Sequence, residues 1–319
     1  MKIVLAPMEG VVDATMRHML TDIGGIDHCV TEFVRISDRL LPRKVFHRLS
    51  PELLNGGKTA SGVPVIVQLL GNHPEMMAMN ACRAAKLGAP GIDLNFGCPA
   101  KTVNKNRGGA VLLQFPDEIH SIVKKVREEV PASVPVTAKM RLGFADKSLA
   151  LENAHAIADA GADGLAVHAR TKVEGYKPPA HWEWIARIRE AIDIPVTANG
   201  EVWNYEDYLQ CRDVSGCDDV MIGRGLIASP DLGLMINSLN RGLDFDPMSW
   251  PVMLSVLEDY LERVVVQMAP KYVHGRLKQW LKMMQRRYPQ AEQMLQEMRT
   301  LKDVAEVRDF LQTYRKKVS

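Results

Sequence analysis

The chain has 319 residues, of which 46% are hydrophobic and 24% charged, and its net charge is +2. These are ordinary values for a soluble globular protein. A chain of this length fits a barrel of roughly 250 residues with an appendix, and it can bury a large core without metals or disulfides.

The cysteines and the apolar segments exclude further classes of protein. The five cysteines have no short repeated spacing, and an odd number of them argues against a disulfide framework or a zinc cluster. The chain begins with a strand-like run at Ile3–Ala6, has no signal peptide and contains no apolar run of about 18 residues. We therefore expect a cytoplasmic protein with no bound metal and no membrane association.

Eight short β-rich segments recur along the chain, and most of them are almost continuously apolar. This pattern is typical of parallel strands that are buried on both faces. The predicted strands are Ile3–Ala6, His28–Thr31, Val65–Leu69, Gly91–Leu94, Val136–Met140, Gly164–His168, Val196–Ala198 and Asp219–Ile222.

Segments with the periodicity of amphipathic helices separate these strands. Strands that alternate with helices indicate an α/β fold, and eight of them favour a (β/α)8 TIM barrel. A doubly wound open sheet is the alternative, although six strands are more usual in that fold. The predicted helices cover residues 74–85, 117–126, 148–160, 182–192 and 205–214.

The alternation ends near Arg241–Pro251, where the stretch from Gly242 to Pro247 is typical of a linker. Beyond it, apolar residues repeat at helical spacing to the end of the chain. We therefore predict two domains, a catalytic barrel at residues 1–243 and a C-terminal helical bundle at residues 244–319.

The end of the chain is basic. Residues 270–319 carry 12 Lys+Arg and 5 Asp+Glu, whereas the remaining residues carry 28 and 33. Such an uneven distribution suggests a polyanionic partner for the C-terminal helices. The alternative is a solvated, positively charged helical surface.

Polar and glycine-rich residues lie at the carboxyl ends of seven of the predicted strands or just beyond them. In a barrel, the catalytic residues lie at the carboxyl ends of the strands. Seven such segments are hard to explain by structure alone, and we therefore expect the active site at this end of the barrel. The segments are Ala6–Gly10, Gln68, Asn95–Pro99, Lys139 with Arg141, His168–Arg170, Asn199–Glu201 and Gly223–Gly225.

The last two of these segments suggest a phosphate site. Gly200, Gly223 and Gly225 would let backbone N–H groups approach an anion, and Arg224 adds a charged donor. Barrel enzymes often bind phosphate after strands 7 and 8. Together with Lys139, which could stabilise the negative charge of a reduced flavin, this arrangement suits flavin mononucleotide. The alternatives are simple tight turns and a lysine paired with an interior carboxylate.

The segment Asp93–Pro99, followed by Gly109-Ala110, resembles the signature of the tRNA-dihydrouridine synthases. The segments at Ala6–Gly10, Lys139–Arg141, His168–Arg170 and Asn199–Glu201 match the same family in the same order, so the resemblance covers almost the whole chain. Further segments resemble the bacterial branch that modifies position 16 in the D-loop of tRNA. They are Thr31–Arg35, Leu41-Pro42, Lys44–Arg48 and Lys278–Leu281.

The resemblance implies bound FMN, NADPH as the reductant, and a helical domain that binds tRNA. It also implies that Cys98 is the general acid, which delivers a proton to C5 of the uracil while the flavin reduces C6. A free thiol is mostly protonated at neutral pH, as an acid must be. We expect the other four cysteines to be inert packing residues, and the chain to act as a monomer.

Carried over residue by residue, the resemblance assigns three groups of contacts. FMN would be lined by Pro7, Met8, Glu9, Gln68, Lys139, His168, Asn199, Gly200, Glu201, Gly223 and Arg224. The target uracil or its nucleotide would face Asn95, Arg141, His168 and Tyr176. The tRNA would be bound by Arg35, Lys271, Tyr272, His274, Arg276, Lys278, Gln279 and Arg299.

Two other functions remain open. A small-molecule FMN barrel reductase of dihydroorotate-dehydrogenase type would share the barrel and the flavin, but it would not need a basic helical appendage of about 70 residues. A non-catalytic tRNA-binding protein on a decayed barrel is the second alternative. The presence of Cys98, Lys139 and His168 together argues against it.

Overall fold

The structure is a computed structural model and describes residues 1–318. It divides into two compact units. Met1–Ala14 and Ile26–Gly223 form the first unit, while Thr15–Gly25 and the chain from Arg224 onward form the second.

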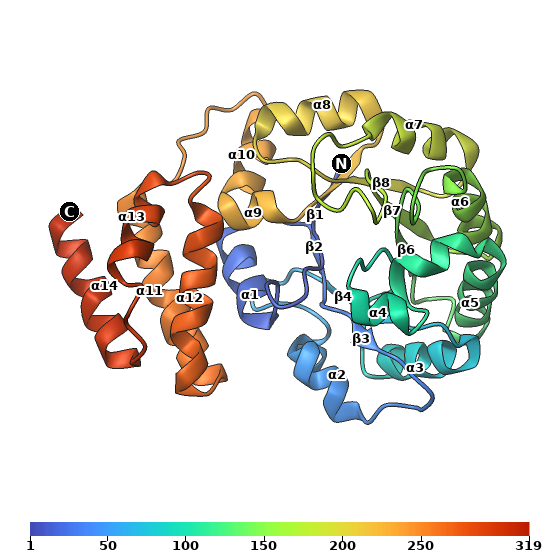
Figure 1. The fold of residues 1–319 in the computed structure, drawn as a ribbon, viewed down its shortest axis with the longest axis horizontal. Coiled ribbons are helices and arrows are strands. Elements are labelled where there is room, and N and C mark those ends of the chain that lie inside the picture. Colours follow the sequence, from blue (N-terminus) through green and yellow to red (C-terminus); the bar gives the residue numbers. More distant parts are fainter. Residues whose placement is uncertain (319) are drawn as a thin grey trace. The chain divides into compact units, whose positions relative to one another are not determined.

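The first unit is a closed barrel of eight parallel strands (Figure 1), which confirms the predicted fold class. β1 pairs with β2 and β9, and β2 pairs with β4, so the ring closes without a free edge. In ring order the strands are β1 (Ile3–Leu5), β2 (His28–Val30), β4 (Val65–Leu70), β5 (Ile92–Phe96), β6 (Val136–Arg141), β7 (Gly164–His168), β8 (Val196–Asn199) and β9 (Asp219–Ile222).

One short strand was not predicted. β3 (Val34–Arg35) pairs in parallel with the end of β4, where Val34 faces Leu69 and Arg35 faces Leu70. Because only two residues pair, no alternating or continuous apolar pattern marks this strand in the sequence.

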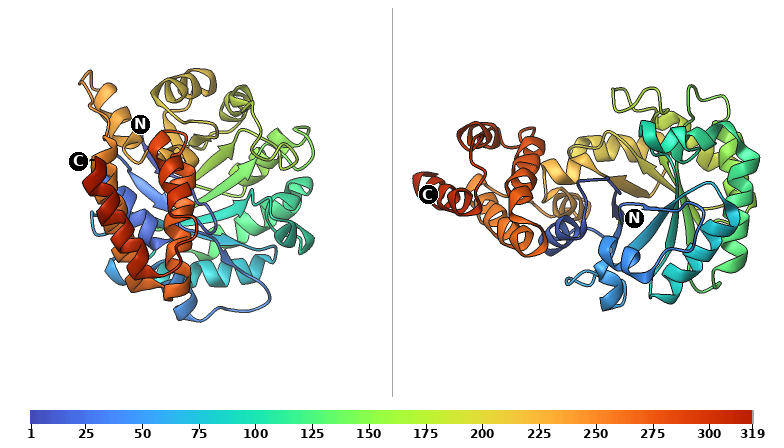
Figure 2. Two further views of the ribbon diagram at one scale, coloured as in Figure 1. Left: turned by 60° about the vertical axis from the view of Figure 1, so that its left-hand side comes forward. Right: turned by 60° about the horizontal axis from the view of Figure 1, so that its bottom comes forward.

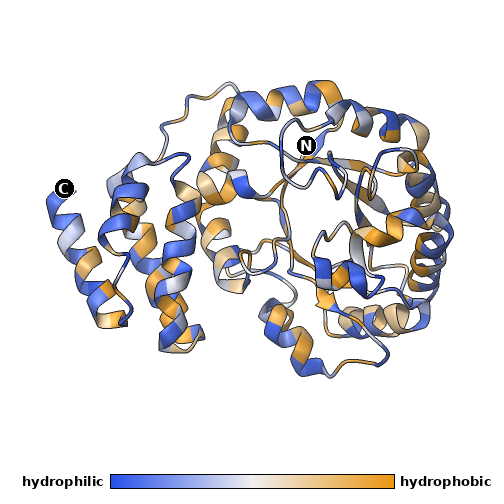
Figure 3. Ribbon diagram, viewed as in Figure 1, coloured by the Kyte–Doolittle hydropathy of each residue, from blue (hydrophilic) through white to orange (hydrophobic). Residues whose placement is uncertain are grey.

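Helices surround the strands of the barrel (Figure 2). Their apolar and polar residues lie on different sides (Figure 3), so one face of each covers the sheet. In α5, for example, the buried residues Ile119, Ile122, Val123 and Val126 recur at helical spacing. All five predicted barrel helices are present: α3 (Pro74–Lys86), α5 (Pro116–Glu129), α6 (Ala150–Asp159), α7 (Trp182–Ala191) and α8 (Tyr205–Ser215).

Shorter helices lie in the loops of the barrel. α4 and the 3-10 helix η2 both belong to the connection that follows β5, next to the predicted catalytic cysteine. The short elements are α2 (Arg43–Leu49), η1 (Pro51–Asn55), α4 (Lys101–Lys105) and η2 (Gly109–Gln114).

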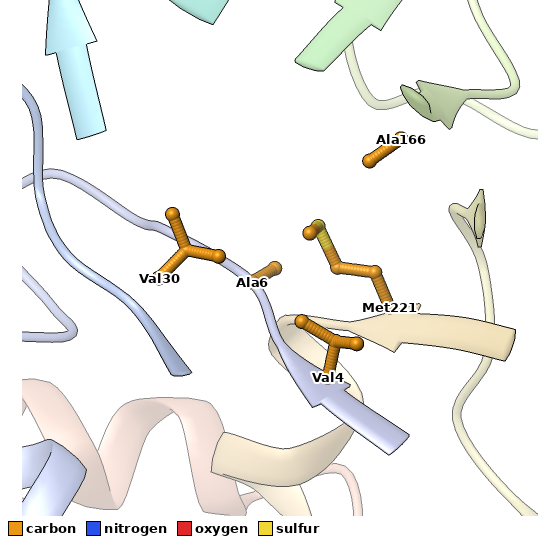
Figure 4. Packing of buried hydrophobic residues seen from close by; sticks show 5 residues of the cluster. All are labelled: Val4, Ala6, Val30, Ala166 and Met221. Atoms are coloured by element: carbon orange, nitrogen blue, oxygen red, sulfur yellow. The ribbon is translucent and has the colours of Figure 1, made fainter. Parts of the chain in front are cut away.

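The interior of the barrel is filled by small and medium apolar side chains. Val4, Val30, Ala166 and Met221 converge from β1, β2, β7 and β9, together with Ala6 just after β1 (Figure 4), and all are at most 7% exposed. The barrel is therefore a packed core at this level rather than a pore.

The second unit is helical. The apolar residues of α11 and α12 that repeat at helical spacing are buried between the helices, as the sequence indicates. Tyr260 and Trp280 pack edge to face with ring centroids 4.7 Å apart. The helices are α1 (Ala14–Ile23), α9 (Arg224–Ala228), α10 (Leu232–Leu239), α11 (Trp250–Gln267), α12 (Pro270–Met284), α13 (Pro289–Glu297) and α14 (Val304–Val318).

The compact second unit extends beyond residues 244–319, because it also contains α1, α9 and α10. The division into a catalytic domain and a tRNA-binding domain stays a prediction. Trp280 Nε1 of α12 donates a hydrogen bond to the Ile227 carbonyl of α9, at 3.0 Å. The stretch after Gly242 has no regular secondary structure, but the helices before and after it belong to the same compact unit. The composition of a segment does not show whether its flanking helices pack together. Within residues 1–318, no helix is long and apolar enough to cross a membrane.

Candidate active site

The pairing register of the strands brings predicted residues of the first unit to two neighbouring levels of the barrel. Asn95 on β5 pairs with Lys139 on β6, and Arg141 on β6 pairs with His168 on β7. His168 in turn pairs with Asn199 on β8. All five lie at the carboxyl ends of their strands, where barrel enzymes carry out their chemistry.

Cys98 lies in the loop that follows β5 and is partly exposed. Its backbone N–H donates to Asn95 Oδ1 at 2.9 Å, and its carbonyl accepts from Ala110 N at 3.1 Å and Asn104 Nδ2 at 2.9 Å. Burial raises the pKa of the thiol. The loop thus holds a protonated thiol at the end of the barrel where the other predicted residues converge, as a general acid requires.

Gly109 makes the close packing of this loop possible. Its φ is +66°, in the left-handed region, and a Cβ would lie 2.8 Å from the Cys98 carbonyl oxygen and 2.9 Å from the Cys98 Cβ. Any side chain at this position would displace the cysteine. The need for space beside Cys98 therefore explains why position 109 of the Gly109-Ala110 pair is a glycine.

Gln68 was predicted to contact the flavin, but both ends of its amide are already engaged. Its Nε2 donates to Asp93 Oδ2 at 2.7 Å, and its Oε1 accepts from Asn95 Nδ2 at 2.7 Å. Asp93 also accepts from Thr137 Oγ1 at 2.7 Å. Gln68 is fully buried and Asp93 is 2% exposed, so these bonds form inside the barrel.

Lys139 carries the positive charge of the site. Among residues 1–318, no hydrogen-bond or ion-pair partner of its ammonium group is found. Burial and the nearby charge of Arg141 lower the pKa of Lys139 to about 8, against the opposing effect of Asp93. A half-buried cation without a partner is costly, and it fits a site for an anionic or electron-rich group such as the pyrimidine edge of a flavin.

The loop after β8 has the backbone conformation of a close-approach site. Gly200 has φ +123°, and a Cβ there would lie 3.2 Å from the His168 ring. Glu201 follows with φ +63°. Its carboxylate accepts hydrogen bonds from the buried Arg170 and, at 2.9 Å, from Trp203 Nε1. These bonds hold a strained turn whose backbone can approach a bound phosphate or flavin.

The residues predicted after β1 and β9 directly follow these two strands. Pro7 and Met8 are half-buried and Glu9 is exposed. Burial, with the charge of Glu32, raises the pKa of Glu9. The Met8 sulfur lies 3.1 Å from the position of a Cβ on Gly223, so these two segments touch. Arg224 is the first residue of α9.

Arg141 was predicted to face the uracil, but most of its donors hold loops together. Its Nε donates to the Gly97 carbonyl at 2.9 Å, and its Nη1 donates to the carbonyls of Thr171 and Gly175 at 3.1 and 2.9 Å. It is 3% exposed. Its guanidinium lies 5.1 Å from the ring centroid of Tyr176, which is 54% exposed.

Sequence reasoning missed the residues that order the loop after β7. Glu174 accepts from Thr171 N at 2.6 Å, Lys147 Nζ at 3.0 Å and, through an ion pair at 3.0 Å, contacts His181 Nε2. Burial alone would raise the pKa of Glu174, but the hydrogen bonds from Thr171 and Lys147 lower it to about 2. These residues lie in a loop without periodicity, so only their contacts identify them.

The predicted tRNA contacts lie outside this cluster. Arg35 is exposed on β3. Of the others, all except Arg299 are on α12, whose 15 residues include no Asp or Glu. Lys271 and Tyr272 are exposed at its N-terminus, with Lys271 Nζ 4.8 Å from the Tyr272 ring centroid. Lys278 Nζ instead donates to the carbonyls of Arg299 and Leu301, at 2.9 and 2.6 Å.

The remaining predicted residues of α12 are less exposed. His274, Arg276 and Gln279 are half-buried, and Arg276 Nη1 donates to Gln279 Oε1 at 2.6 Å. Burial, with the charges of Lys278 and Lys302, lowers the pKa of His274. In the described residues, no group of three or more His, Cys, Asp or Glu side chains is arranged to hold a metal ion.

A closed parallel barrel with a thiol, an unpaired lysine and strained turns at the carboxyl ends of its strands defines a (β/α)8-barrel enzyme. The model of the dihydrouridine synthase family matches residues 4–319. The chain therefore belongs to the dihydrouridine synthase family, whose members are flavin-dependent.

Curated relatives extend over the whole chain. A tRNA-dihydrouridine(16) synthase of Pseudomonas putida is 55% identical over 311 residues, which are 98% of this chain and 96% of that protein. Enzymes with the same name are 52% identical in Shewanella oneidensis, over 96% of both chains, and 49% identical in Neisseria meningitidis serogroup A, over 100% of this chain and 96% of that one.

Solved structures show the fold alone. Histamine dehydrogenase from Rhizobium sp. 4-9 matches with a TM-score of 0.57 at 15% identity, over 82% of this chain and 48% of that chain. This likeness agrees with the barrel and says nothing about the substrate.

Proposed function

We propose that this protein is a tRNA-dihydrouridine synthase that uses FMN and NADPH to reduce the C5–C6 bond of uridine 16 in the D-loop of tRNA. Relatives named tRNA-dihydrouridine(16) synthase, 49–55% identical over nearly full length, support the substrate and the position. The observation that carries the chemistry is the placement of Cys98, Lys139 and His168 at the ends of three adjacent strands. We also propose a cytoplasmic location, because the proposed reaction uses tRNA and NADPH.

The residues present fit an FMN site. Lys139 would face the pyrimidine edge of the flavin ring. The backbone at Gly200 and Gly223 would contact the rest of FMN, and Arg224 would bind its phosphate. Bound FMN would supply the hydride that saturates C6. Gln68 already uses its amide to bond Asp93 and Asn95. It would contact the flavin ring only through the donor and acceptor positions that these two bonds do not use.

The chain's own residues would handle the base and the proton. A uracil must leave its stack to enter the barrel mouth, where the exposed ring of Tyr176 offers a stacking surface. Cys98 keeps its proton because burial raises its pKa, and it would donate that proton to C5. Arg141 would hold the loops of Cys98 and Tyr176 at a constant separation.

An assay with defined RNA tests the proposed function. Purified protein with FMN, NADPH and unmodified tRNA should add two hydrogens to uridine 16, seen as the mass gain of that nucleoside. A tRNA with cytidine at this position should not react. Reduction of a free pyrimidine without tRNA would instead favour the small-molecule reductase, and tRNA binding without reduction would favour the non-catalytic protein.

The basic face of α12 should bind tRNA by phosphate contacts. Lys271→Ala removes an exposed charge at the positive end of this helix, so we expect tRNA affinity to fall several-fold at low salt. The slope of log affinity against log salt should decrease by about one. Fluorescence anisotropy across a salt series measures both quantities.

The matched control for this variant is Lys125→Ala on α5. Lys125 is also a surface lysine, but it pairs with Glu129 on its own helix at 2.8 Å. This change should leave both the affinity and the slope unaltered. Equal effects of the two changes would mean that α12 has no special part in binding.

A further inference from the structure

A continuous chain of side-chain hydrogen bonds runs from the barrel interior to the Cys98 loop. It begins at the buried carboxylate of Asp93 on β5, passes through the amide of Gln68 on β4 and returns through Asn95 on β5, with both side-chain links at 2.7 Å. Asn95 Oδ1 then accepts two bonds, from the backbone N–H groups of Gly97 and Cys98, both at 2.9 Å.

Every link in this chain points in the same direction. A carboxylate offers only acceptors, so Gln68 must turn its NH2 group to Asp93 and its oxygen to Asn95. Asn95 must then turn its NH2 group to Gln68, which leaves its oxygen for the two N–H donors of the loop. The acceptor character of Asp93 therefore selects the one amide orientation of Asn95 that can hold Cys98.

The groups around Asp93 act on the pKa of its carboxyl in opposite directions. Burial has the largest effect and raises this pKa, whereas the donors Gln68 and Thr137 and the positive charge of Lys139 oppose the rise. Asp93 also opposes the lowering of the pKa of Lys139. The same carboxylate thus acts on both the thiol loop and the lysine.

We propose that Asp93 is a positioning residue that, through Gln68 and Asn95, sets the place of Cys98 over the substrate. Asp93 is 2% exposed and Thr137 Oγ1 occupies its second oxygen, so it acts through other residues and not by touching the base. The catalytic part of this inference rests on the function proposed above. The structural part concerns the loop alone.

The test compares Asp93→Ala with Asp93→Asn. Alanine removes both acceptors, so Gln68 loses the group that orients it, whereas asparagine keeps one acceptor and should preserve part of the chain. Amide hydrogen exchange, read by mass spectrometry on a peptide containing Gly97 and Cys98, should be about tenfold faster in Asp93→Ala. Asp93→Asn should lie between that variant and the wild type.

Kinetics and thiol reactivity give the functional half of the test. Misplacement of the acid should lower kcat by about 10²-fold in Asp93→Ala, with the KM for tRNA within about twofold of the wild type. Alkylation of Cys98 by iodoacetamide should accelerate because the loop loosens. Asp93→Asn should recover much of kcat and slow the alkylation again.

The control is Asn80→Ala on α3. Asn80 is fully buried and donates to the carbonyls of Arg39 and Met76 at 3.1 and 2.8 Å, so its loss destabilises the barrel without touching the chain. It should leave exchange at Gly97 and Cys98 unchanged. Equal loosening of that peptide in both alanine variants would overturn the proposal, as would unchanged exchange and kcat in Asp93→Ala.

Two further outcomes are separable. If Asp93→Ala does not fold, Thr137→Val and Thr137→Ser give the same comparison, since only valine removes the hydroxyl that donates to Asp93. Faster exchange in the valine variant alone supports the proposal, and equal rates contradict it. If the wild type forms no dihydrouridine, the proposed function fails, while the exchange data still decide whether Asp93 holds the loop.

Discussion

Cys98→Ala should lower the rate of dihydrouridine formation by about 10²–10⁴-fold, the usual contribution of a general acid. Its loop is held by backbone bonds to Asn95, Asn104 and Ala110, which the substitution leaves in place. FMN content, tRNA affinity and oxidation of NADPH should therefore stay at wild-type levels. Because burial raises the pKa of the thiol, the wild-type acid should remain protonated into mildly alkaline solution.

Single-turnover kinetics with reduced enzyme measure this effect without interference from the flavin-reducing half of the cycle. The control is Cys82→Ala, which removes a partly exposed thiol on α3 whose Sγ contacts the Glu129 carbonyl at 2.8 Å. It should react like the wild type. A Cys98→Ala enzyme with full activity would remove the thiol from the mechanism.

Lys139→Met should lower turnover by about 10²–10³-fold and yet stabilise the flavin-free protein at pH 7. In the folded barrel Lys139 is half-buried, its ammonium has no partner among residues 1–318, and burial lowers its pKa to about 8. Removing this charge should raise the free energy of unfolding by about 1–3 kcal/mol, after allowance for partial solvation. A side chain that destabilises the fold while serving the reaction is typical of a functional site.

The pH dependence of stability distinguishes this explanation from simple repacking. The folded pKa lies below the unfolded one, so between about 8 and the ordinary lysine value the unfolded chain binds more protons. Wild-type stability should rise across this window, and the rise should be smaller in Lys139→Met. Urea unfolding of the flavin-free protein at several pH values measures it.

The control for this pair of effects is Lys125→Met, which removes a surface charge on α5. It should leave turnover unaltered and should not reproduce the stabilisation. A Lys139→Met protein less stable than the wild type at pH 7 would contradict the charge-burial explanation. Normal turnover in that variant would remove Lys139 from the flavin site.

The barrel could be predicted from the sequence, because eight apolar segments separated by amphipathic helices are compatible with few other folds. The sequence did not reveal β3, since the pairing of Val34 and Arg35 depends on the neighbouring end of β4. The predicted domain boundary was based on the composition of the linker-like stretch, whereas the compact units of the structure are defined by which segments pack together.

Within the site, position along a strand could be predicted, but the partner of each side chain could not. Gln68 lies at a strand end, as expected, yet the register that sets it beside Asp93 arises only when β4 and β5 pair. Arg141 was assigned to the substrate through the family resemblance, but three backbone carbonyls compete for its donors. The hydrogen-bond partners of a side chain depend on how neighbouring strands are aligned in the folded barrel. The hydrophobic periodicity of the sequence does not give this alignment.

The route of the chain through the helical unit affects how the protein is made. α1 belongs to that unit, and Thr15 and Asp22 bond Gln267 and Arg263 of α11, at 2.6 and 2.8 Å. On the ribosome, α1 is synthesised early, but the residues of α11 that it bonds are synthesised only after all the strands of the barrel. A fragment ending near residue 243 would leave α1 without α11, so the barrel and the helical unit should be expressed together rather than as separate halves.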